Sequence, residues 1–383
     1  MKVPKFPKIT LPSHTPFHAL QRFVVLTEKL PGCISWNRET WQPTPKPRGE
    51  TTPWYVLSFV VMATTIVYIC IILHQIVVHE KDPDLSLTAG IVFLIVTFLH
   101  ALVCSFIVTF NFKKTDICFV LWNLENVGKS WNYIQNEANQ KYNMIGLVLH
   151  GLILAFMAFP LFACMVPLFL DNVDPTYFLI RNVNFLPFRV KLLCRMLILF
   201  TTVFQLNITG VGFFIILANV LLRVTISLTR ITPFTPSRYR NVQFFKFFLQ
   251  YRQLQVINRV WNDTATSFAL FLPLVVGVPL GYTLIKLRSL MPFPLTFIFA
   301  ALFFIGVSIV HCTVPVMVEI TMRSRDFKRA WKLCRLSPSG AKQVESCAAL
   351  RVHLGMFCVV GVKSRGIFFS MMMYYTLSLI IAL

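Results

Sequence analysis

The chain has 383 residues, 56% of them hydrophobic and 13% charged, with a formal net charge of +21 at pH 7. This composition is that of a membrane protein rather than a soluble one, and it predicts one bundle of several helices, an all-α membrane protein. Because no nucleic-acid-binding motif is present, we attribute the positive charge to loop Lys and Arg residues beside anionic lipid headgroups and expect no nucleic-acid partner.

The N-terminal segment has basic residues but no apolar run ahead of a small-residue cleavage site, so we expect no cleaved signal peptide. Hydropathy then predicts seven membrane spans, in chain order: 54–78, 87–110, 144–170, 196–222, 264–285, 293–318 and 367–383. Pro273 and Pro279 are expected to kink the fifth span. The last span is uncharged and just long enough to cross a hydrocarbon layer about 30 Å thick. Since the sequence stops there, we expect this helix to act within the membrane.

Most of the 36 Lys and Arg residues lie in four segments around the spans: 1–53, 111–143, 223–263 and 319–366. The positive-inside rule therefore predicts a cytoplasmic N-terminus and an extracellular C-terminus. The prediction depends on absolute counts, because the remaining segments are short and basic residues per loop residue are nearly equal on the two sides. No pair of cysteines falls in the expected outside loops, so no external disulfide framework is expected.

The expected inside segments carry helical patterns of their own. Apolar and basic residues recur at helical spacing in 244–261 and in 323–336, and a third helix is expected at 341–357. Two interpretations stay open for these helices. They lie along the inner leaflet, or they form a packed cytoplasmic layer that joins subunits.

Two local stretches resemble a known pattern. Residues 18–26, HALQRFVVL, followed by LPG at 30–32, look like a short helix ahead of the first span. Near the end, Tyr374-Tyr375 is followed by TLSLI and then by Ile381-Ala382. Together with the seven-span layout, these stretches resemble the insect gustatory and odorant receptor superfamily. That family ends on Thr-Tyr, five apolar residues and Gln-Phe; only Tyr375 is kept here, so the chain is similar to a divergent member.

The resemblance implies a chemosensory receptor in the plasma membrane that acts as a ligand-gated, non-selective cation channel. It implies a homo- or hetero-tetramer, a small organic ligand in the outer half of each bundle, and no need for a G protein or a cofactor. It also implies a division of the chain into a cytoplasmic N-terminal segment (1–53), membrane helices one to four (54–222), a cytoplasmic helical loop (223–263), membrane helices five and six (264–318), a cytoplasmic anchor (319–366) and a pore-lining helix (367–383).

The pore-lining prediction concerns one face of the last span. Tyr374, Ser378 and Ile381 are spaced by four and three residues and share that face, and Leu377 flanks it. Leu377 and Ile381 would form a hydrophobic constriction with the Ser378 hydroxyl as its polar lining, and no carboxylate ring is present to impose tight selectivity. The alternative is that this face packs against neighbouring helices.

Aromatic residues are frequent in the expected outer halves of the spans, which favours an apolar ligand pocket with few polar anchors. We expect Gln205 and Tyr282 to be those anchors. The other pocket candidates are Phe93, Phe156, Phe159, Tyr177, Phe200, Phe204 and Phe303. Taken singly, a Phe in a span more often packs or faces lipid. Histidines within the spans are expected to be neutral and hydrogen-bonded, so no metal site is predicted.

Two other functions remain alternatives. A G-protein-coupled-type receptor would need the opposite orientation, and the chain lacks an Asp-Arg-Tyr triplet after span three and an Asn-Pro pair in span seven. A multi-span transporter would show matching broken spans in two halves, and only the prolines of spans three and five hint at that. No HExxH, Walker loop or nucleophile elbow occurs, so we do not expect an enzyme.

Overall fold

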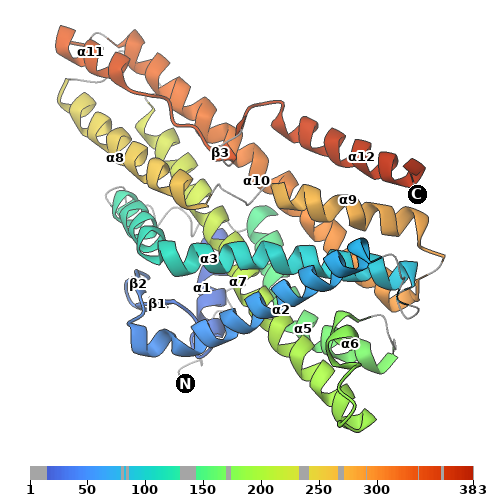
Figure 1. The fold of residues 1–383 in the computed structure, drawn as a ribbon. Coiled ribbons are helices and arrows are strands. Elements are labelled where there is room, and N and C mark those ends of the chain that lie inside the picture. The colour runs from blue at the N-terminus through green and yellow to red at the C-terminus, as the bar shows by residue number, and fades with distance from the viewer. Residues whose placement is uncertain are drawn as a thin grey trace, which may run out of the picture.

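The computed structural model describes residues 15–78, 82, 86–129, 144–169, 174–232, 241–265, 271–289, 291–334, 336–354 and 358–382. Long helices dominate it (Figure 1). In chain order the elements are α1 (Pro16–Thr27), β1 (Ile34–Trp36), β2 (Pro43–Pro45), a 3-10 turn (Arg48–Thr51), α2 (Thr52–Val77), α3 (Leu87–Lys129), α5 (Met144–Phe169), α6 (Pro175–Ile180), α7 (Phe188–Ile231), α8 (Asn241–Ala265), α9 (Phe271–Lys286), α10 (Phe293–Leu333), α11 (Pro338–Ser346), β3 (His353–Leu354), β4 (Cys358–Val359) and α12 (Ser364–Ala382).

A helix occupies each of the seven predicted spans. Within the described residues, six of these helices are long and apolar enough to cross a membrane, namely α2, α3, α5, α7, α10 and α12. The fifth, α9, has 16 residues. The all-α membrane architecture is therefore confirmed, whereas a count of seven crossings and the sidedness of the termini stay predictions.

Three helices run well beyond their predicted spans. The 43-residue α3 continues past 110 and leaves helical geometry only at Lys113, where φ is −116° and ψ is 16°. The 44-residue α7 extends the predicted span at both ends. The 41-residue α10 joins the predicted sixth span to the helix expected at 323–336. Hydropathy marks only the apolar part of such a helix, because its ends bury one face against protein.

The helix expected at 244–261 is confirmed as α8, which includes Thr264 and Ala265, so the fifth predicted span began too early. The helix expected at 341–357 is wrong. Here α11 ends at Ser346, and β3 pairs antiparallel with β4. Side chains of α8 take up the backbone acceptors of the intervening chain. Asn258 and Asn262 each donate from Nδ2 to the Arg351 carbonyl, at 2.9 and 2.8 Å.

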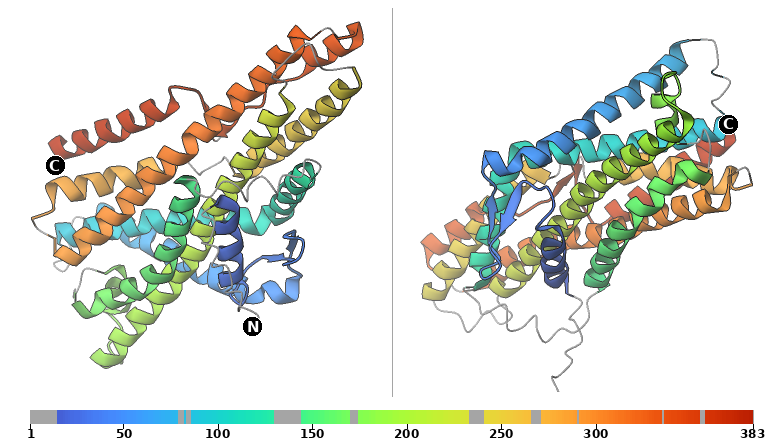
Figure 2. Two further views of the ribbon diagram at one scale, coloured as in Figure 1. Left: turned by 180° about the vertical axis from the view of Figure 1, so that it is seen from behind. Right: turned by 90° about the horizontal axis from the view of Figure 1, so that it is seen from below.

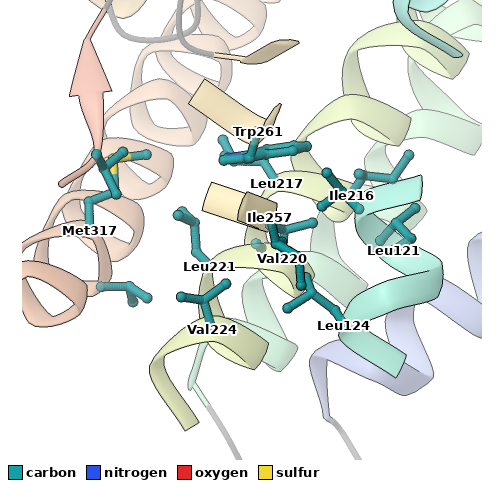
Figure 3. Packing of buried hydrophobic residues seen from close by; sticks show 14 of the residues in the cluster. Leu121, Leu124, Ile216, Leu217, Val220, Leu221, Val224, Ile257, Trp261 and Met317 are labelled. Carbon is teal, nitrogen blue, oxygen red and sulfur yellow. The ribbon is translucent and has the colours of Figure 1, made fainter. Parts of the chain in front are cut away.

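The largest hydrophobic cluster of the described residues includes the place where α3, α7, α8 and α10 come together. Figure 3 shows Leu121 of α3 beside Ile216 of α7 and Leu124 beside Val220, with Trp261 of α8 packed over Leu217. Each of these side chains is nearly or fully buried. This end of the bundle is thus a packed protein core. Such packing within one subunit is what a packed cytoplasmic layer of helices requires.

The short helix expected at 18–26 is confirmed as α1. Thr15 caps it by accepting a hydrogen bond from the His18 N–H at 3.3 Å. It is fixed to α7 by two polar contacts. Asn219 donates from Nδ2 to the Pro16 carbonyl at 3.0 Å, and the Arg223 guanidinium lies 4.7 Å from the centre of the Phe17 ring. Helix α1 is therefore part of the bundle.

Candidate functional site

A cavity of about 240 Å³ lies among α3, α5, α7 and α10, in the half of the bundle that carries α6. Its wall is mainly aliphatic. On α3 the wall residues Val92, Val96, Leu99 and Val103 recur at spacings of three and four, so one face of that helix lines the space. Such a space, lined by apolar groups with a few polar ones, suits a small molecule of low polarity.

Phe159 is the one member of the predicted aromatic set that borders this cavity. Phe93 and Tyr177 instead lie in a separate cluster with Tyr68 and Phe178 under α6, where the Phe93 and Phe178 ring centres are 5.6 Å apart. The structure therefore does not gather the predicted set around one space.

The remaining candidates lie in two other places. Phe200 stacks on Phe204 at 5.8 Å, and Phe204 stacks on Phe156 at 6.1 Å. Tyr282 is buried in the α9–α10 cluster, and Phe303 packs against the same cluster. A role for these aromatic residues in ligand binding stays a prediction. The aliphatic wall was missed because aromatic content was used as the signal, whereas the spacing on α3 could have revealed it.

Gln205, a predicted anchor, is fully buried on α7 and does not border the cavity. Its side-chain amide has no hydrogen-bond partner among the described residues. Two other polar side chains do border the cavity with an unpartnered atom, Nε2 of His100 and Nδ2 of Asn207. The sequence predicted only that histidines within the spans, His100 among them, are neutral and hydrogen-bonded. It did not indicate that His100 borders a cavity.

A buried ion pair closes one end of the cavity. Asp174 and Pro175, at the start of α6, border the space. Arg195 of α7 donates from Nε to Asp174 Oδ2 at 3.3 Å and from Nη2 to Oδ1, and the exposed fractions of the two side chains are 6% and 1%. Thr176 also donates to Oδ2. Because all these groups satisfy one another, the start of α6 is held over the cavity as a fixed cover.

The predicted pore-lining residues share one exposed face of α12, which lies at the edge of the bundle beside α9 and α10 (Figure 2). Tyr374, Leu377 and Ile381 are 67%, 49% and 85% exposed, and Ser378 is also exposed. At 100° per residue this face is opposite Met372 and Thr376, which are buried. The alternative, that the face packs against neighbouring helices, does not occur within one chain.

Helix α12 packs against two glycines of α9, and this contact is called the seat of α12. The two glycines form the sequence Gly277-Val-Pro-Leu-Gly281, a small-xxx-small pattern that lets membrane helices approach closely. A Cβ atom on Gly277 would lie 2.9 Å from Met372 Sδ, and one on Gly281 would lie 3.1 Å from Thr376 Oγ1. The position of α12 therefore depends on the absence of side chains at these two places.

Comparison with solved structures finds the same architecture in an insect olfactory receptor. The structure of OR5 from Machilis hrabei in complex with eugenol matches with a TM-score of 0.70 at 11% identity, over 96% of this chain and 100% of that one. The structure of OR5 described without eugenol matches with a TM-score of 0.63 at 12% identity, over 95% and 98%. No family model and no curated protein sequence matches the chain.

The chain has the insect olfactory receptor fold. At this identity the match concerns the fold alone, so the match does not transfer site residues. In this olfactory receptor fold, Tyr375 of the terminal motif is half exposed on α12, with its ring centre 5.4 Å from that of Tyr374. Within the described residues no cluster of His, Cys, Asp and Glu could hold a metal ion.

One residue of this olfactory receptor fold borders both the cavity and the surroundings of α12. Leu302 of α10 lines the cavity, and it also lines a void of about 40 Å³ together with Gly277 of α9 and Met372 of α12. One aliphatic side chain thus borders both the candidate ligand space and the void beside the buried side of α12. Chemically, the cavity can bind a small apolar molecule.

Proposed function

We propose that the chain is a chemosensory receptor of the insect odorant or gustatory type that acts as a ligand-gated, non-selective cation channel in the plasma membrane. A small organic ligand occupies the cavity among α3, α5, α7 and α10. Four subunits, identical or mixed, surround one pore lined by α12, with the N-terminus cytoplasmic and the C-terminus outside. The fold match over nearly the whole length of both chains carries this proposal.

The apolar face of α12 supports the pore. A single chain leaves Tyr374, Leu377 and Ile381 uncovered, which suits a face that meets other copies and an ion path. Leu377 and Ile381 can close the path by dewetting, and Ser378 supplies hydroxyl groups. The absence of carboxylates from this face of α12 favours weak selectivity among cations.

The position of Leu302 supports gating by the cavity. A ligand that fills the cavity presses on Leu302, and the void of about 40 Å³ behind it leaves room for that side chain to shift toward Met372. Packed interfaces respond to such shifts by switching between discrete arrangements. Binding can therefore bias α12 between a closed and an open arrangement if the open arrangement holds the ligand more tightly.

The direct test is whole-cell recording from cells that express the chain, alone and with candidate partner subunits, during a broad screen of small organic compounds. We expect ligand-evoked cation current. Surface-expressed protein that binds compounds but passes no current in any subunit combination would contradict the channel and favour a transporter or a G-protein-coupled mechanism.

A substitution at Ser378 tests the pore assignment. Ser378→Lys places a positive charge on the exposed face of α12, so we expect it to abolish the cation current or change its selectivity, because a charge in a narrow path repels cations. Ser378→Thr keeps the hydroxyl and serves as the matched control, with current close to that of the unmodified chain. Unchanged conductance and selectivity in Ser378→Lys would remove this residue from the pore.

A further inference from the structure

Among the described residues, the cavity wall carries two polar groups without a partner in the protein. These are Nε2 of His100 and Nδ2 of Asn207. The charged lining residue, Asp174, is engaged by Arg195 and Thr176. A buried polar group left unpaired costs free energy, so a ligand that supplies the missing partner gains affinity. The two groups therefore define which chemical function a ligand needs.

The hydrogen bonding of His100 decides what its free nitrogen can do. Nδ1 of His100 lies 2.8 Å from the Val96 carbonyl oxygen, which can only accept, so Nδ1 carries the proton. The side chain is 1% exposed, and among the described residues no Asp or Glu forms a hydrogen bond or ion pair with it. Burial without a counter-ion favours the neutral ring. In that neutral form Nε2 has a lone pair and no proton, and it acts as an acceptor.

Asn207 supplies the complementary group. Its Nδ2 carries protons and acts as a donor, and its side chain belongs to α7, whereas that of His100 belongs to α3. The rest of the lining is predominantly aliphatic and aromatic. A hydroxyl group is the small polar function that can both donate to an acceptor such as His100 Nε2 and accept from a donor such as Asn207 Nδ2.

We propose that the cavity selects apolar molecules that carry a hydroxyl group, alcohols or phenols, over ethers and hydrocarbons of the same shape, and that His100 is the residue that makes this choice. This inference rests on the proposed receptor function, since it names the ligand class of the same cavity. Sites built to bond a donor reject analogues that lack it, because the buried acceptor is then left unpaired.

The test uses three probes of similar size with the purified full-length protein in detergent: 4-propylphenol, 4-propylanisole and propylbenzene. Their affinities are taken from the concentration dependence of thermal stabilisation. We expect the phenol to bind about five- to tenfold more tightly than the methyl ether, which can only accept. Equal affinity for the phenol and the ether, or no binding of any probe, would overturn the proposal.

His100→Phe removes the acceptor while keeping a ring against Tyr68, whose ring centre is 5.3 Å from that of His100. We expect the phenol-to-ether ratio to fall to about one, with propylbenzene binding retained. His311→Phe, the same substitution at an exposed histidine of α10 that does not border the cavity, is the control and should keep the ratio. A ratio unchanged in His100→Phe would sink the assignment. If this variant does not fold, the comparison of the three probes on the unmodified chain still tests the preference for a hydroxyl group.

The binding assay needs no current, so the two proposals fail separately. Selective binding of the phenol by a protein that never conducts would refute the channel and leave the ligand class standing. Ligand-evoked current with equal responses to the phenol and its ether would support the channel and refute the proposed ligand class.

Discussion

Ser324 of α10 links three segments through one directed chain of hydrogen bonds. The Leu350 N–H donates to Ser324 Oγ at 2.7 Å, and Ser324 Oγ lies 2.7 Å from the Tyr251 hydroxyl. Tyr251 in turn donates to the Ala348 carbonyl at 2.8 Å. Because the chain starts at an amide donor and ends at a carbonyl, Ser324 must donate to Tyr251. Each of the two hydroxyl groups then both accepts and donates one hydrogen bond.

Ser324→Ala should lower stability, because it leaves the buried Leu350 N–H without an acceptor and removes a partner of Tyr251. The expected cost is about 1–3 kcal/mol, seen as a lower apparent melting temperature of the detergent-solubilised protein. Ser308→Ala, on the same helix and away from this junction, is the control. Equal melting temperatures for the two variants would show that the hydrogen-bonded chain contributes little.

The ion pair over the cavity makes a second prediction at this scale. Arg195→Met leaves the buried Asp174 carboxylate without its cation, so we expect a loss of about 3–5 kcal/mol of stability together with weaker ligand binding. The double variant Asp174→Asn, Arg195→Met removes both charges and should recover much of the loss. Thermal unfolding of the three proteins measures both effects. No recovery in the double variant would mean that the guanidinium acts mainly through packing, for example on Tyr177.

At the scale of elements, α12 depends on α9. A Cβ atom on either glycine would lie closer to a side chain of α12 than a normal contact, and α9 also packs against α3 and α10, both of which line the cavity. Ligand space, α10, α9 and the candidate pore helix are thus in continuous contact. Any rearrangement of the cavity wall that moves α10 must either carry α9 and α12 with it or open the seat.

Gly281→Val should disturb this seat, because its side chain meets Thr376 at a distance shorter than normal contact. Overpacking of this kind costs about 1–3 kcal/mol, and we expect altered gating, read as a shifted ligand concentration for half-maximal current. Gly151→Val on α5 is the matched control. A Cβ there meets nothing within 4 Å, and the position borders neither the cavity nor the void behind Leu302. Identical dose–response curves for Gly281→Val and the unmodified chain would argue against the seat.

At the scale of the whole molecule, the structure contains a large apolar surface that a single chain does not use. Part of that surface faces lipid, as in any membrane bundle, where apolar side chains need no protein partner. The face of α12 with Tyr374 and Ile381 is different, because it lies on a helix that one chain covers only on one side, by α9 and α10. We propose that this face meets further copies in an assembly.

The assembly makes a direct prediction. The protein extracted in mild detergent should have a protein mass of about four times 44.0 kDa, as measured by native mass spectrometry or by light scattering with the detergent subtracted. Mixed tetramers with a partner subunit would also satisfy the expectation. A strict monomer under conditions that preserve ligand binding would favour a transporter or a G-protein-coupled mechanism instead.

The sequence alone was enough to predict the all-helical membrane class, helices in the seven apolar segments except for the start of the fifth, α8, and the shared face of Tyr374, Ser378 and Ile381. These features follow from local hydropathy and the 3.6-residue period, whereas α1 was expected from the family resemblance. The absence of a helix at 347–354 came from the tertiary structure, in which Asn258 and Asn262 of α8 both donate to the Arg351 carbonyl. The cavity, which is bordered by Phe159 and by aliphatic faces of four helices, was likewise visible only in the tertiary structure. A cavity depends on how helices cross, and no local pattern records the crossing.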